Sequence, residues 1–437
     1  MEKTMKLPNH ITQAPEILRR YLFYQKSQHW NRQQVLDYQN AKLKEIVVYA
    51  GKYVPYYREL FREIGLDTST FRGIEDLQKI PLLDKETLRT RQKEFIADTV
   101  HELDAQVEKT SGSTGTPLTL MIDKHSRANK YAAYARAFRW AGYRPGALRF
   151  VIKGLSESKS KPCGYDPLRN MIYLNSSKMT RENCLAAAKL AAKHKPTVFE
   201  GYARSFIDFY NHTCNDYKIA SPRGIFVYGE SVTQPIREFV QSAYGAHLFD
   251  FYSHAENAVM ICEKPDQKMC LMEDYFYPEI VDPQGHTAVD GYGELVGTSF
   301  YNYAMPFIRY KTRDLVRLGH EQNKNFAFRQ VETIEGRMDD YILLPDGRKI
   351  YFAEGAVGYA KGVIAAQYIQ DQPGHLTIKL IVDDTFSEDQ YPMIEQGLVK
   401  RIGDSLKVHF KIVNELEKKP SGKVPFIINR IGVEHLD

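Results

Sequence analysis

The middle of the chain alternates strand candidates with helix candidates, and this pattern limits the fold more than any other feature. An apolar run at 224–228 predicts a strand, and Thr233 predicts the N-cap of a helix that ends near Gly245. A second apolar run at 247–252 predicts the next strand. Strands and helices in alternation indicate an α/β sandwich.

The flanking segments predict further elements and a domain boundary. Residues 1–100 have a helical pattern, with one apolar face over 43–61 and a helix from Lys85 capped by Asp84. Residues 107–122 predict strand, turn and strand, followed by a helix that Gly142 ends. Residues 275–330 predict a β-rich segment. Beyond Gly336, a strand at 376–382, a helix at 388–406 and a strand at 408–413 predict a small α+β module. We therefore expect two domains, 1–336 and 337–437.

Composition excludes several classes of protein. The chain has 437 residues, 43% of them hydrophobic, which is enough for a large core. The formal net charge is only +5, so we expect no dedicated nucleic-acid surface. No run of about 18 apolar residues predicts a transmembrane helix, and the N-terminus lacks the apolar run of a signal peptide. We expect a cytoplasmic protein whose five scattered cysteines are reduced thiols.

The segment 110–117, Thr-Ser-Gly-Ser-Thr-Gly-Thr-Pro, is the first candidate for chemistry. Its glycines let the backbone approach a ligand, and its hydroxyls and free N–H groups suit phosphate oxygens. The Walker A pattern is absent. A polar surface turn is the alternative. The order of residues between two strands favours phosphate binding by six residues: Ser111, Gly112, Ser113, Thr114, Gly115 and Thr116.

Three further motifs carry groups that suit a nucleotide. Tyr252 offers a flat ring on which adenine can stack, and Glu256 offers the hard oxygen that Mg²⁺ prefers. Asp314 can accept hydrogen bonds from both ribose hydroxyls. Lys423 can bring positive charge to a phosphate as negative charge develops. Each of these residues, taken alone, is also compatible with an ordinary solvated or structural role.

These motifs, in this order over 110–423, resemble the adenylate-forming superfamily, which includes acyl-CoA synthetases and firefly luciferase. The N-terminal segments at 49–58 and 80–85 resemble the phenylacetate–CoA ligase branch and its capsular-polysaccharide-biosynthesis relatives. The resemblance implies that Gly229 and Glu230 flank adenine and that Arg337 reaches the nucleotide. It also implies that Asp339 is a hinge for a mobile C-terminal domain carrying the catalytic Lys423. Two departures are Ser253 and Arg313, where the family usually has glycine.

The resemblance implies a large multi-sheet adenylation domain and an ATP- and Mg²⁺-dependent enzyme. Such an enzyme converts a carboxylic acid to an acyl-adenylate, releases pyrophosphate and passes the acyl group to an amine or a thiol such as CoA. Capsule or surface-polysaccharide biosynthesis is the first expectation, and a phenylacetate-type acyl-CoA ligase is the close alternative. A non-catalytic nucleotide-binding scaffold on the same fold is the third reading. The sequence does not indicate the acid or the oligomeric state.

A zinc site is a separate question. His254, Cys262 and Cys270 follow one another at intervals of eight residues, and imidazole and thiolates bind Zn²⁺. Relatives of the phenylacetate–CoA ligase branch can carry Cys/His zinc sites in this region. The alternative is one active-site histidine with two buried thiols, because no CxxC pair is present.

Overall fold

The computed structural model describes residues 12–110, 118–154, 161–230, 232–319, 327–338, 341–350, 357, 360–402, 405–419 and 424–431. These residues form two compact units that each combine separate stretches of the chain. Unit 1 comprises 1–145 and 251–334, and unit 2 comprises 146–250 and 335–437. Among the described helices, none combines the length and the hydropathy that a transmembrane span requires.

Unit 1 begins with helices whose ends follow local sequence signals. Asn31 forms a capping box with Gln34. Asp84 accepts a hydrogen bond from the backbone N–H of Thr87, as the sequence predicts. The single apolar face expected over 43–61 is divided at Val54, because Pro55 starts a new helix. The helices are α2 (Ala14–Ser27), α3 (Arg32–Tyr53), α4 (Pro55–Glu63), α5 (Ile74–Leu77), α6 (Lys85–Thr90) and α7 (Lys124–Trp140).

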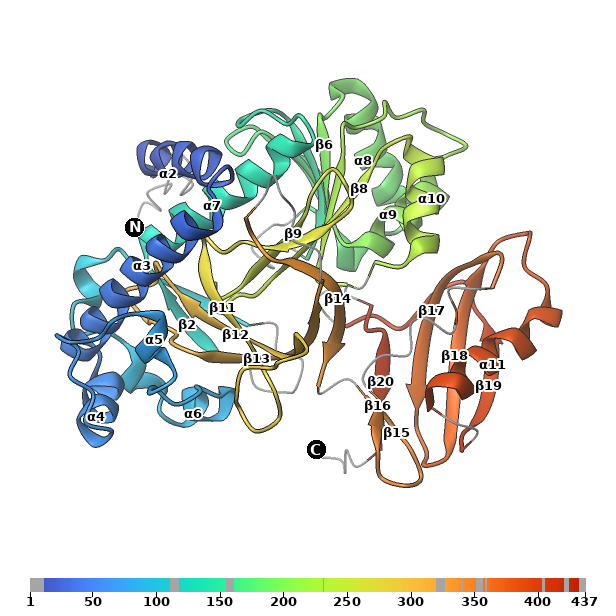
Figure 1. The fold of residues 1–437 in the computed structure, drawn as a ribbon. Coiled ribbons are helices and arrows are strands. Elements are labelled where there is room, and N and C mark those ends of the chain that lie inside the picture. The colour runs from blue at the N-terminus through green and yellow to red at the C-terminus, as the bar shows by residue number, and fades with distance from the viewer. Residues whose placement is uncertain are drawn as a thin grey trace. The chain divides into compact units, whose positions relative to one another are not determined.

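The strands of unit 1 form a hairpin and part of a larger sheet (Figure 1). The expected strand, turn and strand over 107–122 are present as an antiparallel pair, β1 (Gln106–Lys109) and β2 (Thr119–Ile122). The other strands follow the order β11-β12-β13-β14-β10-β9-β8. They are β8 (Leu248–Ser253), β9 (Met260–Glu263), β10 (Met269–Leu271), β11 (Phe276–Val281), β12 (Tyr292–Ser299), β13 (Tyr310–Leu318) and β14 (Gln330–Arg337).

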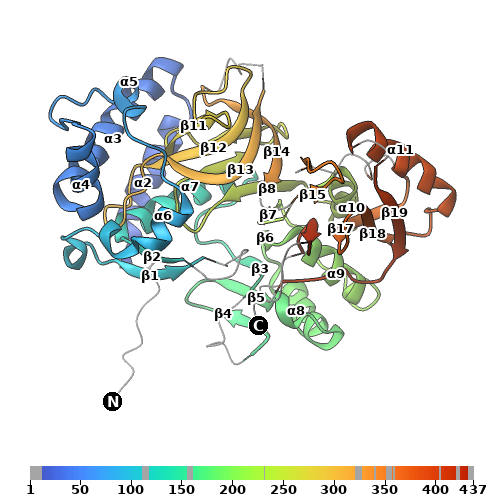
Figure 2. The same ribbon diagram turned by 90° about the horizontal axis from the view of Figure 1, so that it is seen from below.

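Unit 2 contains the α/β layers that the alternating pattern predicts. β5, β3, β6 and β7 are parallel, and β4 pairs antiparallel at the edge. Helices α8, α9 and α10 lie beside these strands (Figure 2). Their apolar side chains form one buried cluster with those of the strands. The elements are β3 (Arg149–Lys153), β4 (Cys163–Asp166), β5 (Met171–Asn175), α8 (Arg181–His194), β6 (Val198–Gly201), α9 (Ala203–Thr213), β7 (Ile225–Tyr228) and α10 (Gln234–Tyr244).

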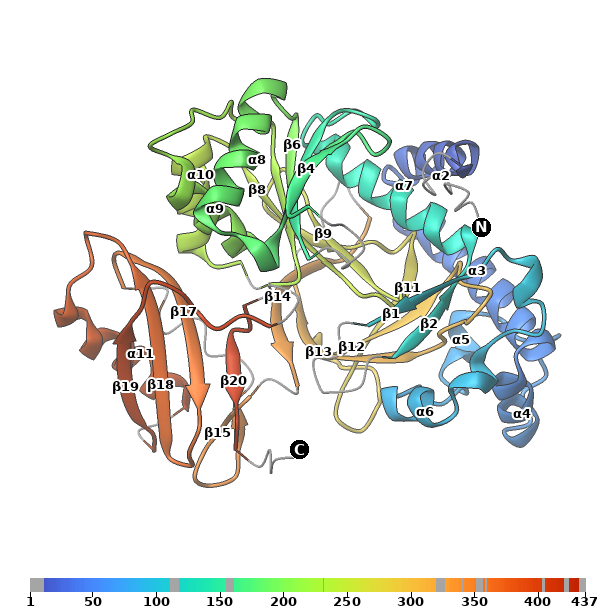
Figure 3. The same ribbon diagram turned by 180° about the vertical axis from the view of Figure 1, so that it is seen from behind.

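The rest of unit 2 is a small sheet of order β19-β18-β17-β20, with α11 against one face (Figure 3). The predicted strand, helix and strand of the C-terminal module are all present, with the helix shorter than expected. β17 and β20 are additional strands that the sequence pattern did not indicate. The elements are β15 (Ile342–Leu343), β16 (Lys349–Ile350), β17 (Val363–Gln370), β18 (His375–Val382), α11 (Tyr391–Ile402), β19 (Lys407–Ile412) and β20 (Ile427–Asn429). The fold class is therefore confirmed, whereas the division at 336/337 stays a prediction.

Candidate active site

The end of β8 and the middle of β13 bring three predicted residues together in unit 1. The hydroxyl of Tyr252 donates to Oδ2 of Asp314 at 2.7 Å, and Nε2 of His254 lies 2.9 Å from the same oxygen. The rings of Tyr252 and His254 meet edge to face, with centroids 5.0 Å apart. Asp314 is buried, at 3% exposure. One carboxylate is thus held in place from two side chains of another segment.

The residue before Asp314 adopts a backbone conformation that glycine prefers. Arg313 has φ = 65°, in the left-handed region, at an irregularity in the pairing of β12 with β13. Its backbone N–H donates to Oε1 of Glu294 at 2.9 Å, which holds the strained conformation in place. Arg313 thus adopts a conformation that glycine takes without strain, at the position where the family usually has glycine.

Glu256 follows β8 and is largely buried, at 7% exposure. Its Oε1 accepts a hydrogen bond of 3.1 Å from the hydroxyl of Tyr310, the first residue of β13. Ser253, the second departure from the family pattern, shares a 2.5 Å hydrogen bond with the hydroxyl of Tyr134 on α7. A carboxylate oriented by a tyrosine and carrying further acceptor sites fits the oxygen ligands that Mg²⁺ prefers.

In unit 2, the predicted turn after β7 has a different set of contacts. Gly229 has φ = 75°, which explains the glycine at this position. The carboxylate of Glu230 accepts backbone hydrogen bonds from Arg204 at 3.1 Å and from Val424 at 2.9 Å. Both oxygens of Glu230 therefore bind the protein's own backbone, and an adenine-flanking role stays a prediction.

Sequence reasoning missed a second acidic residue near this turn. Glu200 is the residue before Gly201, which ends β6, and it is buried, at 8% exposure. It lies 2.6 Å from Arg149 and accepts a 3.3 Å hydrogen bond from the Tyr228 hydroxyl. Burial alone would raise the pKa of Glu200, but the charges of Arg149 and Lys153 lower it overall. The available signal in the sequence was the position of Glu200 within an otherwise apolar strand.

Several predicted residues lie outside the described part of the chain. They are Ser111, Gly112, Ser113, Thr114, Gly115, Thr116, the proposed hinge Asp339 and the proposed catalytic Lys423. The residues that flank the first segment are described. The backbone N–H of Thr110 donates to the carbonyl of Leu118 at 3.0 Å, and the Leu118 N–H donates to the Thr110 hydroxyl. For Arg337 only the backbone is described, at the end of β14.

The three predicted zinc ligands do not gather into a metal site. Cys262 and Cys270 face each other across β9 and β10, but His254 is engaged by Asp314. Burial raises the pKa of the Cys270 thiol to about 12, which disfavours the thiolate that zinc requires. Within the described residues, no three or more side chains of His, Cys, Asp and Glu form a cluster able to hold a metal ion. The donor set therefore does not fit zinc. Cys262 and Cys270 are buried thiols, as the alternative expected, and an active-site role for His254 stays a prediction.

Comparisons with known proteins agree with this arrangement. The family model described as the CapK C-terminal domain matches residues 343–430. The phenylacetate-coenzyme A ligase of Aromatoleum evansii is 27% identical over 419 residues, covering 90% of this chain and 93% of that protein. Protein CapK of Staphylococcus aureus is 22% identical, covering 91% and 90%. The chain belongs to the adenylate-forming ligase superfamily.

A solved structure supports the fold of this superfamily member. The crystal structure of 2-hydroxyisobutyryl-CoA ligase in the postadenylation state has a TM-score of 0.72 at 20% identity, covering 89% of this chain and 88% of that one. As a member of the superfamily, the chain is an AMP-forming, acyl-activating ligase. The matched C-terminal segment lies inside the small domain predicted at 337–437.

Proposed function

We propose that the enzyme joins a carboxylic acid to the AMP part of ATP and then passes the acyl group to a thiol or an amine. In the first step a carboxylate oxygen attacks the α-phosphorus. The bond between the α-phosphorus and the bridging oxygen breaks, and pyrophosphate leaves with that electron pair. In the second step the nucleophile attacks the acyl carbon, loses its proton and displaces AMP. Because it uses ATP, we place the enzyme in the cytoplasm.

The observation that carries the proposal is the buried cluster of Tyr252, His254 and Asp314 in unit 1. A carboxylate has about four acceptor sites, and Tyr252 and His254 approach a single oxygen of Asp314. A carboxylate can accept hydrogen bonds from the two hydroxyls of a ribose. Because both neighbours fix the carboxylate before the ligand arrives, little reorganisation is needed on binding.

Mg²⁺ would be held by the Glu256 carboxylate, where it would supply positive charge to the phosphate oxygens of ATP. Tyr310 orients this carboxylate by its hydrogen bond. We assign phosphate binding to the segment 111–116 and charge stabilisation at the α-phosphate to Lys423. Arg337 and Glu230 are assigned to the nucleotide, and Asp339 to the hinge, on the resemblance to the superfamily.

We assign the acceptor of the acyl group from the similarity to named relatives. Those named phenylacetate-coenzyme A ligase favour the thiol of CoA, and that is our first assignment. An amine acceptor in surface-polysaccharide synthesis is the second assignment, on the resemblance to capsular-polysaccharide-biosynthesis relatives, and the chain also matches CapK over most of its length.

An ATP–pyrophosphate exchange assay over a panel of aryl, alkyl and sugar carboxylic acids tests the adenylation step. We expect exchange with at least one acid, and we expect Lys423→Ala to abolish it while the unfolding transition is unchanged. Full exchange in Lys423→Ala would contradict the role of this lysine. ATP binding without exchange for any acid would favour a non-catalytic scaffold. Mass analysis of products with and without CoA then separates a thioester from an amide.

A further inference from the structure

A cluster of charged side chains lies on one face of the parallel strands of unit 2. The side chains that pack with α8, α9 and α10 include those of Ile152, Phe199 and Val227. Because side chains alternate between the two faces of a strand, the residues next to these in sequence point to the opposite face. In the register of β3, β6 and β7, that opposite face carries Lys153, Glu200 and Tyr228.

The cluster lies at the carboxyl ends of these strands, where the order of the sheet changes direction. β3 and β6 are neighbours in the sheet but do not follow each other in the chain. From β3 the chain runs to β4 and β5 on one side, and it returns through α8 to β6 on the other side. Open α/β sheets bind ligands outside the carboxyl ends of the strands at such a switch point. Lys153 ends β3 and Tyr228 ends β7.

Glu200 is ionised and has capacity for further hydrogen bonds. Its Oε2 lies 2.6 Å from Nη1 of Arg149, and its Oε1 accepts a 3.3 Å hydrogen bond from the Tyr228 hydroxyl. The ring of Tyr228 meets that of Tyr202 edge to face, with centroids 5.8 Å apart, so two aromatic groups limit the position of the phenol. A carboxylate has about four acceptor sites, and these two contacts leave others for a ligand.

Lys153 contributes a second positive charge beside Glu200. It is half-buried, and among the described residues it has no hydrogen-bond or ion-pair partner. Its charge nevertheless acts on Glu200, because it helps Arg149 to keep the pKa of that carboxyl below the usual value despite burial. Arg149 already neutralises Glu200, so Lys153 leaves the cluster with a net charge of +1. An ion pair with a purely structural role would not need this extra cation.

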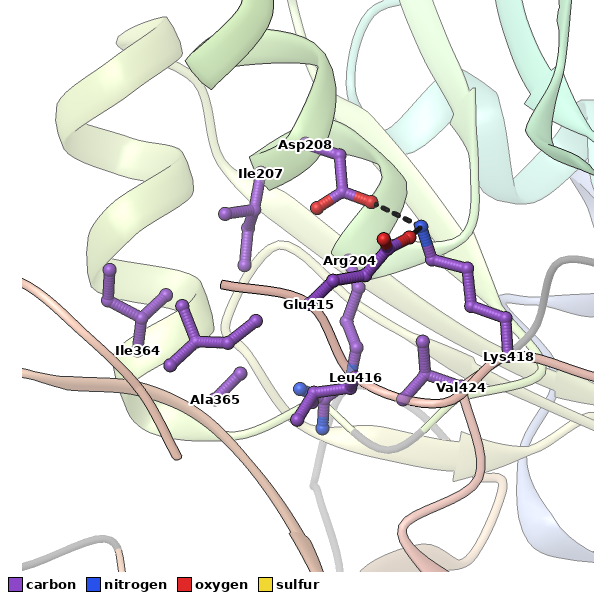
Figure 4. Close-up of a pocket in the computed structure, with 10 residues that line it drawn as sticks. Arg204, Ile207, Asp208, Ile364, Ala365, Glu415, Leu416, Lys418 and Val424 are labelled. Atoms are coloured by element: carbon purple, nitrogen blue, oxygen red, sulfur yellow. Dashed lines mark hydrogen bonds and ion pairs between the residues drawn. The ribbon is translucent and has the colours of Figure 1, made fainter. Parts of the chain in front are cut away.

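A second candidate in unit 2 has no room for a ligand. The hollow beside Asp208, Glu415 and Lys418 has a volume of about 10 Å³, close to the space of one water molecule (Figure 4). Nζ of Lys418 lies 3.0 Å from the carboxylate of Asp208 and 2.7 Å from that of Glu415. This lysine therefore has two carboxylate partners of its own, in contrast to Lys153.

We infer that Lys153 and Glu200 form a subsite for a hydroxyl group of the carboxylic acid substrate, so that the enzyme activates hydroxylated acids such as sugar acids. A hydroxyl both accepts and donates a hydrogen bond, so one group can accept from the ammonium and donate to the carboxylate. The inference rests on the proposed function, because Tyr228 directly precedes Gly229 and Glu230, and Glu230 is assigned to the nucleotide. A plain aryl or alkyl acid would leave both charged groups without a partner.

Pairs of acids with the same carbon skeleton test the subsite in the exchange assay. We would compare 3-hydroxybutyrate with butyrate, and glucuronate with cyclohexanecarboxylate. A hydrogen bond to a charged group changes affinity by about tenfold to a hundredfold, so wild type should favour the hydroxylated member of at least one pair by about that factor in kcat/KM. Preference for both acids without hydroxyls, or for the dicarboxylic acid glutarate over all four, would overturn the inference.

Variants of the two charged residues test whether they cause the preference. Lys153→Met and Glu200→Gln should each lower the preference about tenfold or more, whereas Lys153→Arg keeps the charge and should retain most of it. Lys189→Met is the control, because it removes an exposed lysine from α8, which packs on the other face of the strands. If Glu200→Gln does not fold, Lys153→Met decides alone, since it changes a half-buried residue at a strand end. An unaltered preference in Lys153→Met would contradict the subsite.

Isothermal titration calorimetry on the full-length enzyme needs no turnover and separates the subsite from the reaction. Wild type should bind 3-hydroxybutyrate or glucuronate about tenfold more tightly than Lys153→Met does. Equal dissociation constants, or no binding of either acid to wild type, would count against the subsite even where exchange is normal. Tighter binding by wild type without exchange for any acid would support the subsite and contradict the proposed function.

Discussion

The phenol of Tyr252 donates a hydrogen bond of 2.7 Å to the buried carboxylate of Asp314, across 62 positions of sequence. The sequence suggested separate tasks for these residues, a ring for adenine and a carboxylate for ribose. The structure joins them, so that the ring and the carboxylate hold each other's orientation. The His254 ring, 2.9 Å from the same oxygen, limits the remaining freedom of the carboxylate.

Tyr252→Phe should weaken ATP binding while keeping the flat ring. The variant removes one hydrogen bond to a charged group, worth about 1.5 kcal/mol, so KM for ATP should rise about tenfold. Steady-state pyrophosphate release at saturating acid measures the change. Tyr165→Phe is the control, because it removes an exposed hydroxyl that bonds Asn170 far from the site in sequence. An unchanged KM in Tyr252→Phe would contradict a role for this hydrogen bond in orienting Asp314.

Glu256→Gln should raise the requirement for Mg²⁺. The amide oxygen can still accept the Tyr310 hydrogen bond, so the local fold is kept while the negative charge is lost. We expect the Mg²⁺ concentration for half-maximal rate to increase about tenfold or more, as measured by pyrophosphate release over a magnesium titration.

Tyr310→Phe tests the orientation of the Glu256 carboxylate separately from its negative charge. It removes the hydrogen bond but leaves the Glu256 carboxylate, so its magnesium requirement should change less than that of Glu256→Gln. A larger effect from Tyr310→Phe would mean that Glu256 acts through packing and not as a metal ligand.

The sequence predicted those elements whose signals are local. Asp84 and Thr233 cap helices because a short polar side chain reaches an N–H three residues on, and both caps are present. The strand and turn at 224–230 follow from an apolar run and a glycine. These features need no knowledge of the rest of the chain.

Contacts between distant residues could not be predicted in the same way. Glu230 and Val424 are 194 positions apart, and nothing in either segment indicates that a backbone N–H occupies the carboxylate. Gln367 in β17 is fully buried, but no pattern marked it, since a lone polar residue in a strand usually faces solvent. The prediction of a zinc site was not supported for a related reason. Even spacing along the chain says nothing about where the side chains point, and His254 points to Asp314.

Arg136→Met should destabilise unit 1 strongly. Arg136 and Asp274 are both fully buried and lie 2.5 Å apart, and the arginine also lies over the ring of Tyr24. Removing the cation leaves the buried Asp274 carboxylate without its charged partner, which costs about 3–5 kcal/mol. Urea unfolding followed by fluorescence measures this free energy. Arg169→Met, which breaks a partly exposed pair with Asp166, should cost under about 1 kcal/mol. Similar losses in the two variants would contradict this explanation.

Alkylation of the cysteines should follow burial and thiol pKa. Burial raises the pKa of Cys184 and of Cys270 to about 12, so roughly one part in 10⁴ of either thiol is ionised at pH 8. Cys214 is exposed and should react first with iodoacetamide, as peptide mass spectrometry would show. Between about pH 9 and pH 12, the folded protein keeps the thiol protons of Cys184 and Cys270, whereas the unfolded chain loses them. Stability should therefore fall as the pH rises from about 9 towards 12. Alkylation of native Cys270 as fast as Cys214 at pH 8 would mean that β9 and β10 open, contrary to the buried pair of thiols described above.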